Sequence, residues 1–364
     1  LKPTVPRKKA EIVDSYQELR LRFKGNYGLV FRAYDDGVAY RFVSFINSEV
    51  TVNKESFTLN FAGSTTALFP KEDSMLSSYE PSYQLSDIDT ISTNTFCSLP
   101  LLAIVNKVNV LFTETNLSDY PGMFLFGTNE NALEGGFQHN VKDAVPAEQD
   151  GDRYQLLEYN DYLAKTNGRR DFPWRVMLVT DDDKQLIKST LVYQLSSPTK
   201  IMDTNWIKPG KVAWDWYNAN NIYGIDFKSG INTETYKYYI DFASRYGLEY
   251  INLDEGWSKS TTKIDEPNPD IDIKELVAYG KQKNVSVILW LLWGSLEKDL
   301  GVLDIYESWG IKGIKVDFMQ RSDQYMVKYL ERLAVAASKR HLLINYHGIY
   351  KPAGLERMYP NVIT

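Results

Sequence analysis

The chain has 364 residues, of which 43% are hydrophobic and 24% are charged, and its formal net charge is −6 at pH 7. This length favours two domains, and the negative charge argues against a surface for polyanions, so we expect no nucleic-acid partner. The longest apolar run, 285–293, is far shorter than the roughly 20 residues of a spanning helix, so we expect no membrane span. Cys97 is the only cysteine, which excludes an intrachain disulfide and a multi-thiolate metal site.

The first 200 residues contain short runs in which apolar and polar residues alternate. These runs lie at 16–23, 28–34, 38–45, 108–115 and 173–182. Many short alternating segments separated by turns predict an all-β sandwich. Pro198 and the Pro209–Gly210 pair interrupt strand and helix periodicity alike, so we divide the chain into an N-terminal β-sandwich domain at 1–200 and a second domain at 201–364.

From residue 201 onward one unit recurs, which consists of an apolar strand, a polar or aromatic tip and an amphipathic helix. The strands with their tips lie at 211–221, 250–257, 285–295, 311–318 and 342–348, and helices are expected at 233–247, 272–284 and 322–340. Nearly continuous apolar strands are typical of a parallel sheet that is covered on both faces. The repeat therefore predicts a (β/α)8 TIM barrel, whose chemistry lies at the carboxyl ends of the strands.

The number of repeats is smaller than a closed barrel requires. Five strands end near Trp216, Asp254, Trp290, Asp317 and Tyr346, whereas a closed barrel needs about eight. Five strands alone would leave a long parallel edge unpaired. We therefore expect only about the first five βα units in this sequence, which would make it a piece of a longer polypeptide.

Asp317 and Lys315 are the first candidates for chemistry. Residues two apart on a strand point to the same face, so both side chains would lie inside the barrel at its rim. A nearby lysine favours the ionised carboxylate that a nucleophile toward an anomeric carbon requires. Asp317 would serve equally well as the N-cap of the segment that follows.

Other strand tips carry residues that suit a sugar. Asp254 could accept hydrogen bonds from two vicinal hydroxyls, and Trp257 follows it closely. Asp254 and Trp257 suit a capped turn with a packed tryptophan equally well, and a lone histidine such as His347 is usually structural. Aromatic faces pack on the C–H groups of sugars, and the further candidates at the tips are Trp214, Asp215, Trp216, Trp290 or Trp293, and His347.

The sequence contains no zinc-binding HExxH motif, no EF-hand loop and no Gly-rich nucleotide-binding motif. Glu114, in the segment 113–123, is the one residue that we consider as an oxygen ligand for a hard cation such as Ca²⁺.

Several motifs, in this order, resemble glycoside hydrolase family 97 over almost the whole chain. They are TETNLSDYPGMFL (113–125), PWRVMLV (173–179), KVAWDWYNANN (211–221), YINLDEGW (250–257), KGIKVDF (312–318) and NYHGIYKPAGLERMYPNVIT (345–364). The resemblance implies an N-terminal β-super-sandwich, a (β/α)8 barrel, action on α-glycosides and a bound calcium ion. Glu114 matches a calcium ligand of the family's sandwich domain.

Asp317 decides between two mechanistic groups of that family. Inverting members lack an aspartate at the tip of the fourth strand, whereas retaining members of the α-galactosidase type have a nucleophilic aspartate there. The resemblance therefore implies that Asp317 is the nucleophile and that its general acid/base is a glutamate beyond Thr364. Glu356 does not match that motif position and is not a candidate.

We accordingly expect an exo-acting, retaining α-galactosidase that cleaves α-galactoside oligosaccharides in the periplasm. Asp254, Asp215, Lys315, His347 and the rim tryptophans would bind the non-reducing sugar. The alternatives are an α-glucosidase, a pentopyranosidase that recognises a galactose-like ring, and a carbohydrate-binding protein without catalytic activity.

Overall fold

The computed structural model describes residues 1–146 and 154–363, which form two compact units, each discontinuous in sequence. The sandwich unit comprises Leu1–Thr199, Gln320–Glu331 and Gly348–Met358, and the parallel-sheet unit comprises Lys200–Met319, Arg332–His347 and Tyr359–Thr364. Two segments of the second expected domain are thus grouped with the sandwich.

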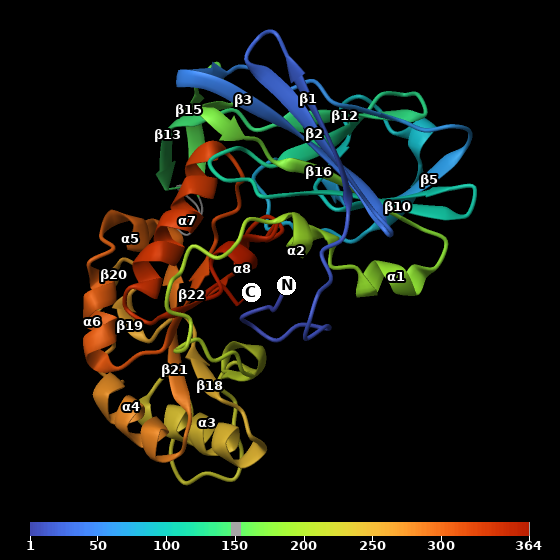
Figure 1. The fold of residues 1–364 in the computed structure, drawn as a ribbon. Coiled ribbons are helices and arrows are strands. Elements are labelled where there is room, and N and C mark those ends of the chain that lie inside the picture. Colours follow the sequence, from blue (N-terminus) through green and yellow to red (C-terminus); the bar gives the residue numbers. More distant parts are fainter. Residues whose placement is uncertain (147–153, 364) are drawn as a thin grey trace. The chain divides into compact units, whose positions relative to one another are not determined.

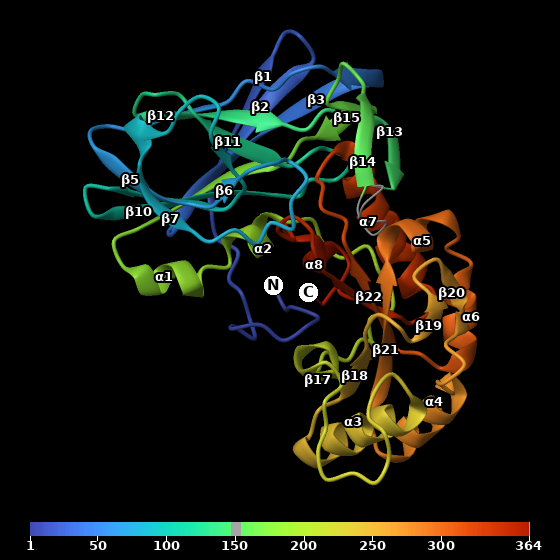
Figure 2. The same cartoon turned by 180° about the vertical axis from the view of Figure 1, so that it is seen from behind.

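The sandwich unit consists of two antiparallel sheets, seen from opposite sides in Figures 1 and 2. The larger sheet has the order β1 (Gln17–Phe23), β2 (Tyr27–Tyr34), β3 (Gly37–Val52), β16 (Trp174–Thr180), β10 (Val108–Thr115), β9 (Leu101–Val105), β5 (Thr65–Phe69) and β7 (Gln84–Asp87), with β15 (Ala164–Asp171) also paired to β3. The smaller sheet has the order β4 (Thr58–Asn60), β12 (Ala132–Phe137), β11 (Met123–Gly127), β8 (Phe96–Cys97) and β6 (Lys71–Glu72), and β13 (Val141–Pro146) pairs with β14 (Tyr154–Tyr159). The predicted sandwich is confirmed.

The core of this sandwich follows from the alternation in the sequence. Phe112 of β10 is buried with Leu101 of β9, and both belong to one apolar cluster with Leu125 of β11 in the other sheet. Because successive side chains of a strand point to opposite faces, one alternating face of each sheet supplies this cluster.

Several short elements were not predicted, and the first two helices of the chain are among them. α1 (Asp183–Lys188) begins after Asp182, whose side chain accepts a hydrogen bond from the amide of Lys184, and α2 (Leu191–Leu195) follows it. Helices of fewer than two turns are too short to show a 3.6-residue period. Others are the 3-10 turns at Ile88–Thr90 and Trp216–Asn218 and the helices α5 (Trp293–Lys298), α6 (Val302–Trp309) and α8 (Leu355–Met358).

The parallel-sheet unit contains a five-stranded parallel sheet whose strands follow one another in chain order. They are β17 (Val212–Trp214), β18 (Tyr250–Leu253), β21 (Ser286–Leu292), β22 (Gly313–Asp317) and β23 (Leu343–Tyr346). The helices between them are α3 (Thr233–Tyr246), α4 (Ile273–Gln282), α5 (Trp293–Lys298), α6 (Val302–Trp309) and α7 (Gln324–Ser338), and β19 (Ser258–Ser260) pairs with β20 (Lys263–Pro267). This order is that of successive βα units of a TIM barrel.

Local sequence signals set the ends of the first helix. The side chain of Asn232 accepts a hydrogen bond from the amide of Thr235, and α3 ends at Gly247 in the left-handed conformation, with φ of 67°. α3 packs against β17 and β18, and α4 packs against β21. These helices cover the outer face of the sheet, so apolar side chains are needed on both faces of the strands.

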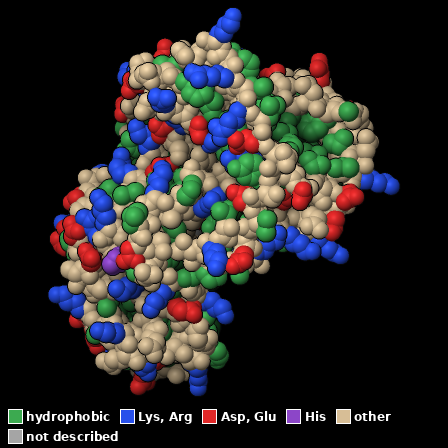
Figure 3. Space-filling model, in the orientation of Figure 1, with side chains coloured by type: hydrophobic (Ala, Val, Ile, Leu, Met, Phe, Trp, Pro, Cys, Tyr) green, Lys and Arg blue, Asp and Glu red, His purple; other side chains and the backbone are tan. Residues whose placement is uncertain are grey.

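The surface seen in Figure 3 has basic and acidic side chains interspersed, without a continuous basic area on that face. Among the described residues, no helix has both the length and the hydrophobicity to cross a bilayer.

Candidate active site

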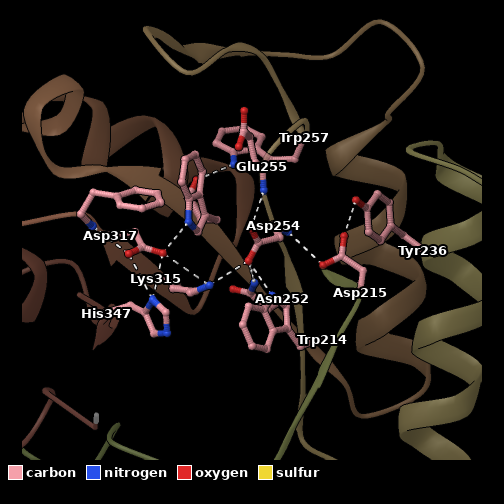
Figure 4. Close-up of polar contacts among 12 residues, drawn as sticks. Trp214, Asp215, Tyr236, Asn252, Asp254, Glu255, Trp257, Lys315, Asp317 and His347 are labelled. Atoms are coloured by element: carbon pink, nitrogen blue, oxygen red, sulfur yellow. Dashed lines mark hydrogen bonds and ion pairs between the residues drawn. The ribbon is translucent and has the colours of Figure 1, made fainter. Parts of the chain in front are cut away.

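The carboxyl ends of the five parallel strands meet at one edge of the sheet, which we call the rim. Asp317 is the last residue of β22 and is 5% exposed. Its Oδ2 accepts a hydrogen bond from the indole Nε1 of Trp290 at 3.1 Å, and Nδ1 of His347 lies 3.1 Å from both of its oxygens. Figure 4 shows Asp317 and His347 facing one another, and Trp290, Asp317 and His347 come from β21, β22 and the end of β23. The carboxylate is therefore held by side chains from the two strands that flank β22.

Lys315 joins Asp317 to a second carboxylate. Its Nζ lies 2.9 Å from Oδ2 of Asp254 and 3.7 Å from Oδ2 of Asp317. The same ammonium group lies 3.9 Å from the centre of the Trp214 ring, a cation–π contact. Lys315 and Asp254 are each 5% exposed. One cation thus lies between two carboxylates and is buried with them.

These surroundings keep Asp317 ionised. Burial alone would raise the pKa of its carboxyl, but the hydrogen bond and charge of His347, the Trp290 indole N–H and the positive charge of Lys315 outweigh burial. The pKa of Asp317 therefore lies below its ordinary value. An ionised carboxylate at neutral pH is what nucleophilic attack requires.

Each of the two carboxylates also accepts a hydrogen bond from the residue that follows it. The amide of Glu255 donates to Oδ1 of Asp254 at 2.9 Å, and the amide of Phe318 donates to Oδ1 of Asp317 at 2.7 Å. Phe318 has a φ of 63°, which is unusual for a bulky residue. Backbone of this kind tends to occur at functional sites, which supports the assignment of a site at this strand tip.

Aromatic side chains at the first strand tip are the most accessible of the predicted ones. Trp216 is 63% exposed, and its ring stacks on that of Trp214 with 5.8 Å between the ring centres. Trp214 also donates its indole N–H to Oδ2 of Asp254 at 2.5 Å. Trp214 thus combines a hydrogen bond to Asp254 with a ring next to Lys315, while Trp216 offers a face to solvent.

Trp257 and Asp215 are the most deeply buried of the predicted sugar-binding residues, and Trp290 is 4% exposed. Trp257 is 0% exposed, and its indole N–H donates to the main-chain oxygen of Trp290 at 2.7 Å. Asp215 is 2% exposed and points toward α3, where the hydroxyl of Tyr236 donates to its Oδ2 at 2.7 Å (Figure 4). Neither side chain is available to a ligand in this structure, which corrects the expectation of direct sugar contact.

Two residues that contact these groups, Asn252 and Tyr236, were not predicted from the sequence. Asn252 on β18 donates to Oδ2 of Asp254 at 3.3 Å, and Tyr236 on α3 holds Asp215. Asn252 could have been identified from its spacing, because it lies two residues before Asp254 and so on the same face of the strand. Nothing in the sequence indicates the partner of Tyr236.

Glu114 lies in the sandwich unit and is 0% exposed. Its Oε1 accepts hydrogen bonds from the amide of Met123 at 2.9 Å and from Nζ of Lys351 at 2.5 Å, and its Oε2 accepts one from Arg175 at 2.5 Å. Arg175 in turn pairs with Glu55. Two cations therefore balance two carboxylates, and the described residues contain no group of three or more His, Cys, Asp or Glu side chains that could hold a metal ion. This arrangement alone does not fit a calcium site.

The rim of the parallel sheet combines a buried, ionised aspartate at a strand tip, a second carboxylate paired with lysine, and tryptophan side chains. Carboxylates that flank a sugar are the catalytic groups of most glycoside hydrolases, and barrels of this kind carry their chemistry at this edge. The fold and the site together are typical of that class of enzyme.

Comparison with known protein families agrees. The family model for the glycosyl-hydrolase 97 N-terminal domain matches residues 2–198, and the model for glycoside hydrolase 97 matches residues 215–364. The chain belongs to glycoside hydrolase family 97. It is 39% identical to a retaining alpha-galactosidase from Bacteroides thetaiotaomicron over 98% of this chain and 56% of that protein. The chain thus spans little more than half the length of this relative.

Solved structures show the same fold. A glycoside hydrolase family 97 enzyme from Pseudoalteromonas sp. strain K8 in complex with acarbose superposes with a TM-score of 0.74 at 23% identity, covering 93% of this chain and 54% of that one. A beta-arabinopyranosidase superposes with a TM-score of 0.73 at 26% identity, covering 92% of this chain and 54% of that one.

Proposed function

We propose that the whole protein is an exo-acting, retaining α-galactosidase with Asp317 as its nucleophile. The observation that carries this proposal is the environment of Asp317, which is buried at a strand tip and kept ionised by His347, Trp290 and Lys315. The relative from Bacteroides thetaiotaomicron, named a retaining alpha-galactosidase, supports the choice of reaction and sugar.

The reaction proceeds in two displacements. In the first, a carboxylate oxygen of Asp317 forms a bond to the anomeric carbon, the glycosidic C–O bond breaks, and the leaving oxygen takes a proton from the general acid. In the second, the same group, now a base, removes a proton from water, whose oxygen attacks the anomeric carbon and releases Asp317. The acid/base is expected outside the residues of this chain.

The proposal is tested by following the hydrolysis of an aryl α-galactoside by the whole protein with proton NMR. A retaining enzyme releases the α-anomer of galactose first, and the β-anomer forms later by mutarotation. Initial release of the β-anomer would contradict the double displacement. Sugar binding without any release of phenol would favour the alternative of a non-catalytic carbohydrate-binding protein.

A pentopyranosidase is the alternative that a specific observation favours. One structural neighbour is named a beta-arabinopyranosidase, and L-arabinopyranose has the ring configuration of galactose without the exocyclic hydroxymethyl group. The ratio of kcat/KM for an aryl α-galactoside and an aryl β-L-arabinopyranoside separates the two activities. A higher value for the pentoside would replace the galactosidase proposal.

His347 provides a prediction about pH. Replacing it with asparagine removes its charge next to Asp317, and with it an interaction that lowers the pKa of that carboxyl. The pKa of Asp317 should then rise, so that the carboxylate protonates at higher pH and the acidic limb of kcat/KM moves upward. His341→Asn is the matched control, because His341 lies before β23, at the opposite end from His347. An unchanged acidic limb in His347→Asn would contradict this role.

We also propose that calcium binds the whole protein with Glu114 as one ligand, although its partners in this structure are Lys351 and Arg175. Calcium prefers several oxygen ligands at about 2.3–2.6 Å, so the ammonium group of Lys351 would have to give way and further carboxylates would have to contribute. Chelation should lower activity reversibly, and Glu114→Gln should weaken calcium binding in titration calorimetry and raise the calcium concentration that activity requires. Equal calcium affinity in the variant would remove Glu114 from the site.

A periplasmic location is a further proposal, which rests on the family resemblance alone. Cell fractionation with cytoplasmic and periplasmic marker enzymes tests it, and recovery with the cytoplasmic marker would contradict it.

A further inference from the structure

Asp215 is a buried carboxylate next to the rim that the proposed reaction does not use. It follows β17 directly, and its side chain lies between the main chain of Asp254 and the hydroxyl of Tyr236 on α3 (Figure 4). It is 2% exposed and both of its oxygens accept hydrogen bonds from within the protein, so we assign it no contact with a sugar. Burying a carboxylate costs free energy unless it is hydrogen-bonded, so its contacts indicate what it does.

Both oxygens of Asp215 hold a defined partner. Oδ2 accepts the hydrogen bond from the hydroxyl of Tyr236 at 2.7 Å, and Oδ1 accepts one from the main-chain amide of Asp254 at 3.2 Å. The Asp215 carboxylate thereby connects the end of β17 to the main chain at the end of β18, and Tyr236 of α3 bonds to its other oxygen. Asp215 thus acts on the main chain of a residue whose side chain lies at the rim.

The carboxylate of Asp254 is fixed at its other end by side chains of the rim. Its Oδ2 receives hydrogen bonds from Lys315 at 2.9 Å and from Trp214 at 2.5 Å. These donors fix the position of the Asp254 carboxylate, whereas Asp215 fixes the position of the Asp254 main chain. A shift of the main chain would therefore strain or break the contacts of the carboxylate.

We propose that Asp215, held by Tyr236, is a positioning residue that fixes the main chain of Asp254 and so aims the Asp254 carboxylate at the bound sugar. This inference rests on the proposed function, in which Asp254 binds sugar hydroxyls. Those hydroxyls are remote from the bond that breaks. Loss of the contact should therefore weaken substrate and transition state alike and appear in KM more than in kcat.

The groups around Asp215 set the pKa of its carboxyl, and we therefore expect KM to depend on pH. Burial raises its pKa, the hydrogen bond from Tyr236 opposes this, and the negative charge of Asp254 adds to it, so that the pKa rises to about 6. Asp254 faces it from β18, and Tyr236 and Tyr239 face it from α3. Above this pH the carboxylate can accept both hydrogen bonds. Below it, the bound proton weakens its hold on the Asp254 amide, and KM should rise.

The test compares four variants of the whole protein with an aryl α-galactoside. Asp215→Ala removes the acceptor for the Asp254 amide. Asp215→Asn keeps an oxygen for this amide but cannot ionise. Tyr236→Phe removes the hydroxyl on α3 that donates to Asp215. Tyr239→Phe is the matched control, because it makes the same chemical change on the same helix and its hydroxyl donates to Asn218 instead.

We expect KM to rise by about tenfold or more in Asp215→Ala, which corresponds to one charge-assisted hydrogen bond, with a smaller rise in Tyr236→Phe and no change in Tyr239→Phe. Asp215→Asn, which is uncharged at every pH, should show throughout the pH range the raised KM that the wild type shows below about pH 6. A purely structural role would lower the folded fraction and hence the apparent kcat, but would leave KM and its pH dependence unchanged.

The outcomes separate this inference from the proposed function. An active wild type together with an unchanged KM in Asp215→Ala, or a wild-type pH profile in Asp215→Asn, overturns the inference alone. If Asp215→Ala does not fold, Asp215→Asn and Tyr236→Phe decide by the same criteria. A wild type that neither binds nor cleaves α-galactosides overturns the proposed function and this inference with it.

Discussion

Replacing Asp317 with alanine should lower the turnover of an aryl α-galactoside by the whole protein by a factor on the order of a thousand or more. The side chain is the group from which the glycosyl-enzyme would form, and Trp290, His347 and Lys315 are arranged around it to keep it ionised. Removing it leaves these donors without the carboxylate that they stabilise. The steady-state rate, measured with circular dichroism to confirm folding, checks the prediction.

Azide provides the second part of this experiment. A small anion can enter the space left by the Asp317 carboxylate and attack the anomeric carbon from the same side. Asp317→Ala should therefore regain activity with azide and produce β-galactosyl azide, the product of a single inversion. Asp304→Ala is a control on an exposed aspartate of α6 that pairs with Arg340. Near-normal activity of Asp317→Ala without azide would contradict the nucleophile assignment.

The strand tips of the parallel sheet could be predicted from the sequence because two local signals coincide there. Apolar runs mark the strands, and polar residues mark the points where they end. Lys315 and Asp317 lie two residues apart, so their common face follows from strand geometry. The structure confirms the sandwich and the parallel strands, and it places Lys315 between Asp254 and Asp317.

The buried positions of Asp215 and Trp257 could not be obtained from the tips alone. Asp215 follows Trp214 directly, so the alternation of a strand would send the two side chains to opposite faces. The direction was therefore present in the sequence, but the partner was not, because Tyr236 lies on a helix 21 residues away. Trp257 lies beyond the end of β18, where alternation no longer applies.

Glu114 shows a different limit. Its cross-strand neighbour is Arg175 in the register of β10 and β16, and Lys351 approaches from a segment 237 residues away. A motif reports the residues next to a carboxylate in the chain, whereas the charge that surrounds it depends on pairs that are distant in sequence. The sequence therefore predicted a calcium ligand and could not predict the two cations that hold it in this structure.

Asp254 gives the prediction with the largest effect on sugar choice. Galactose differs from glucose in its axial O4, and a site that is built to bind one hydroxyl discriminates against the epimer because buried polar groups are then left unpaired. Asp254 lies at the rim with Lys315 and Trp214 bonded to the same oxygen. A charged group in this position can distinguish hydroxyl positions through charge-assisted hydrogen bonds.

The acceptor capacity of Asp254 defines how a sugar could bind. A carboxylate has about four lone-pair sites, and Lys315, Trp214, Asn252 and the amide of Glu255 already donate to it. The contact from Asn252 is the longest of the four, at 3.3 Å. Three of these donors share Oδ2, so we expect a sugar hydroxyl that approaches Oδ2 to replace the contact from Asn252, the longest of them, while Lys315 remains in place.

The whole protein should therefore show a kcat/KM for an aryl α-galactoside at least about a hundredfold above that for the α-glucoside. Asp254→Ala should lower the kcat/KM for the galactoside by about ten- to a hundredfold for each charge-assisted hydrogen bond that is lost. Asn252→Ala is the companion variant. If a hydroxyl replaces the amide, it should change kcat/KM far less than Asp254→Ala does. Equal values for the two sugars, or a preference for glucose, would exclude the galactosidase while leaving the fold and the role of Asp317 intact, because Asp317 acts at the anomeric carbon, which both sugars share.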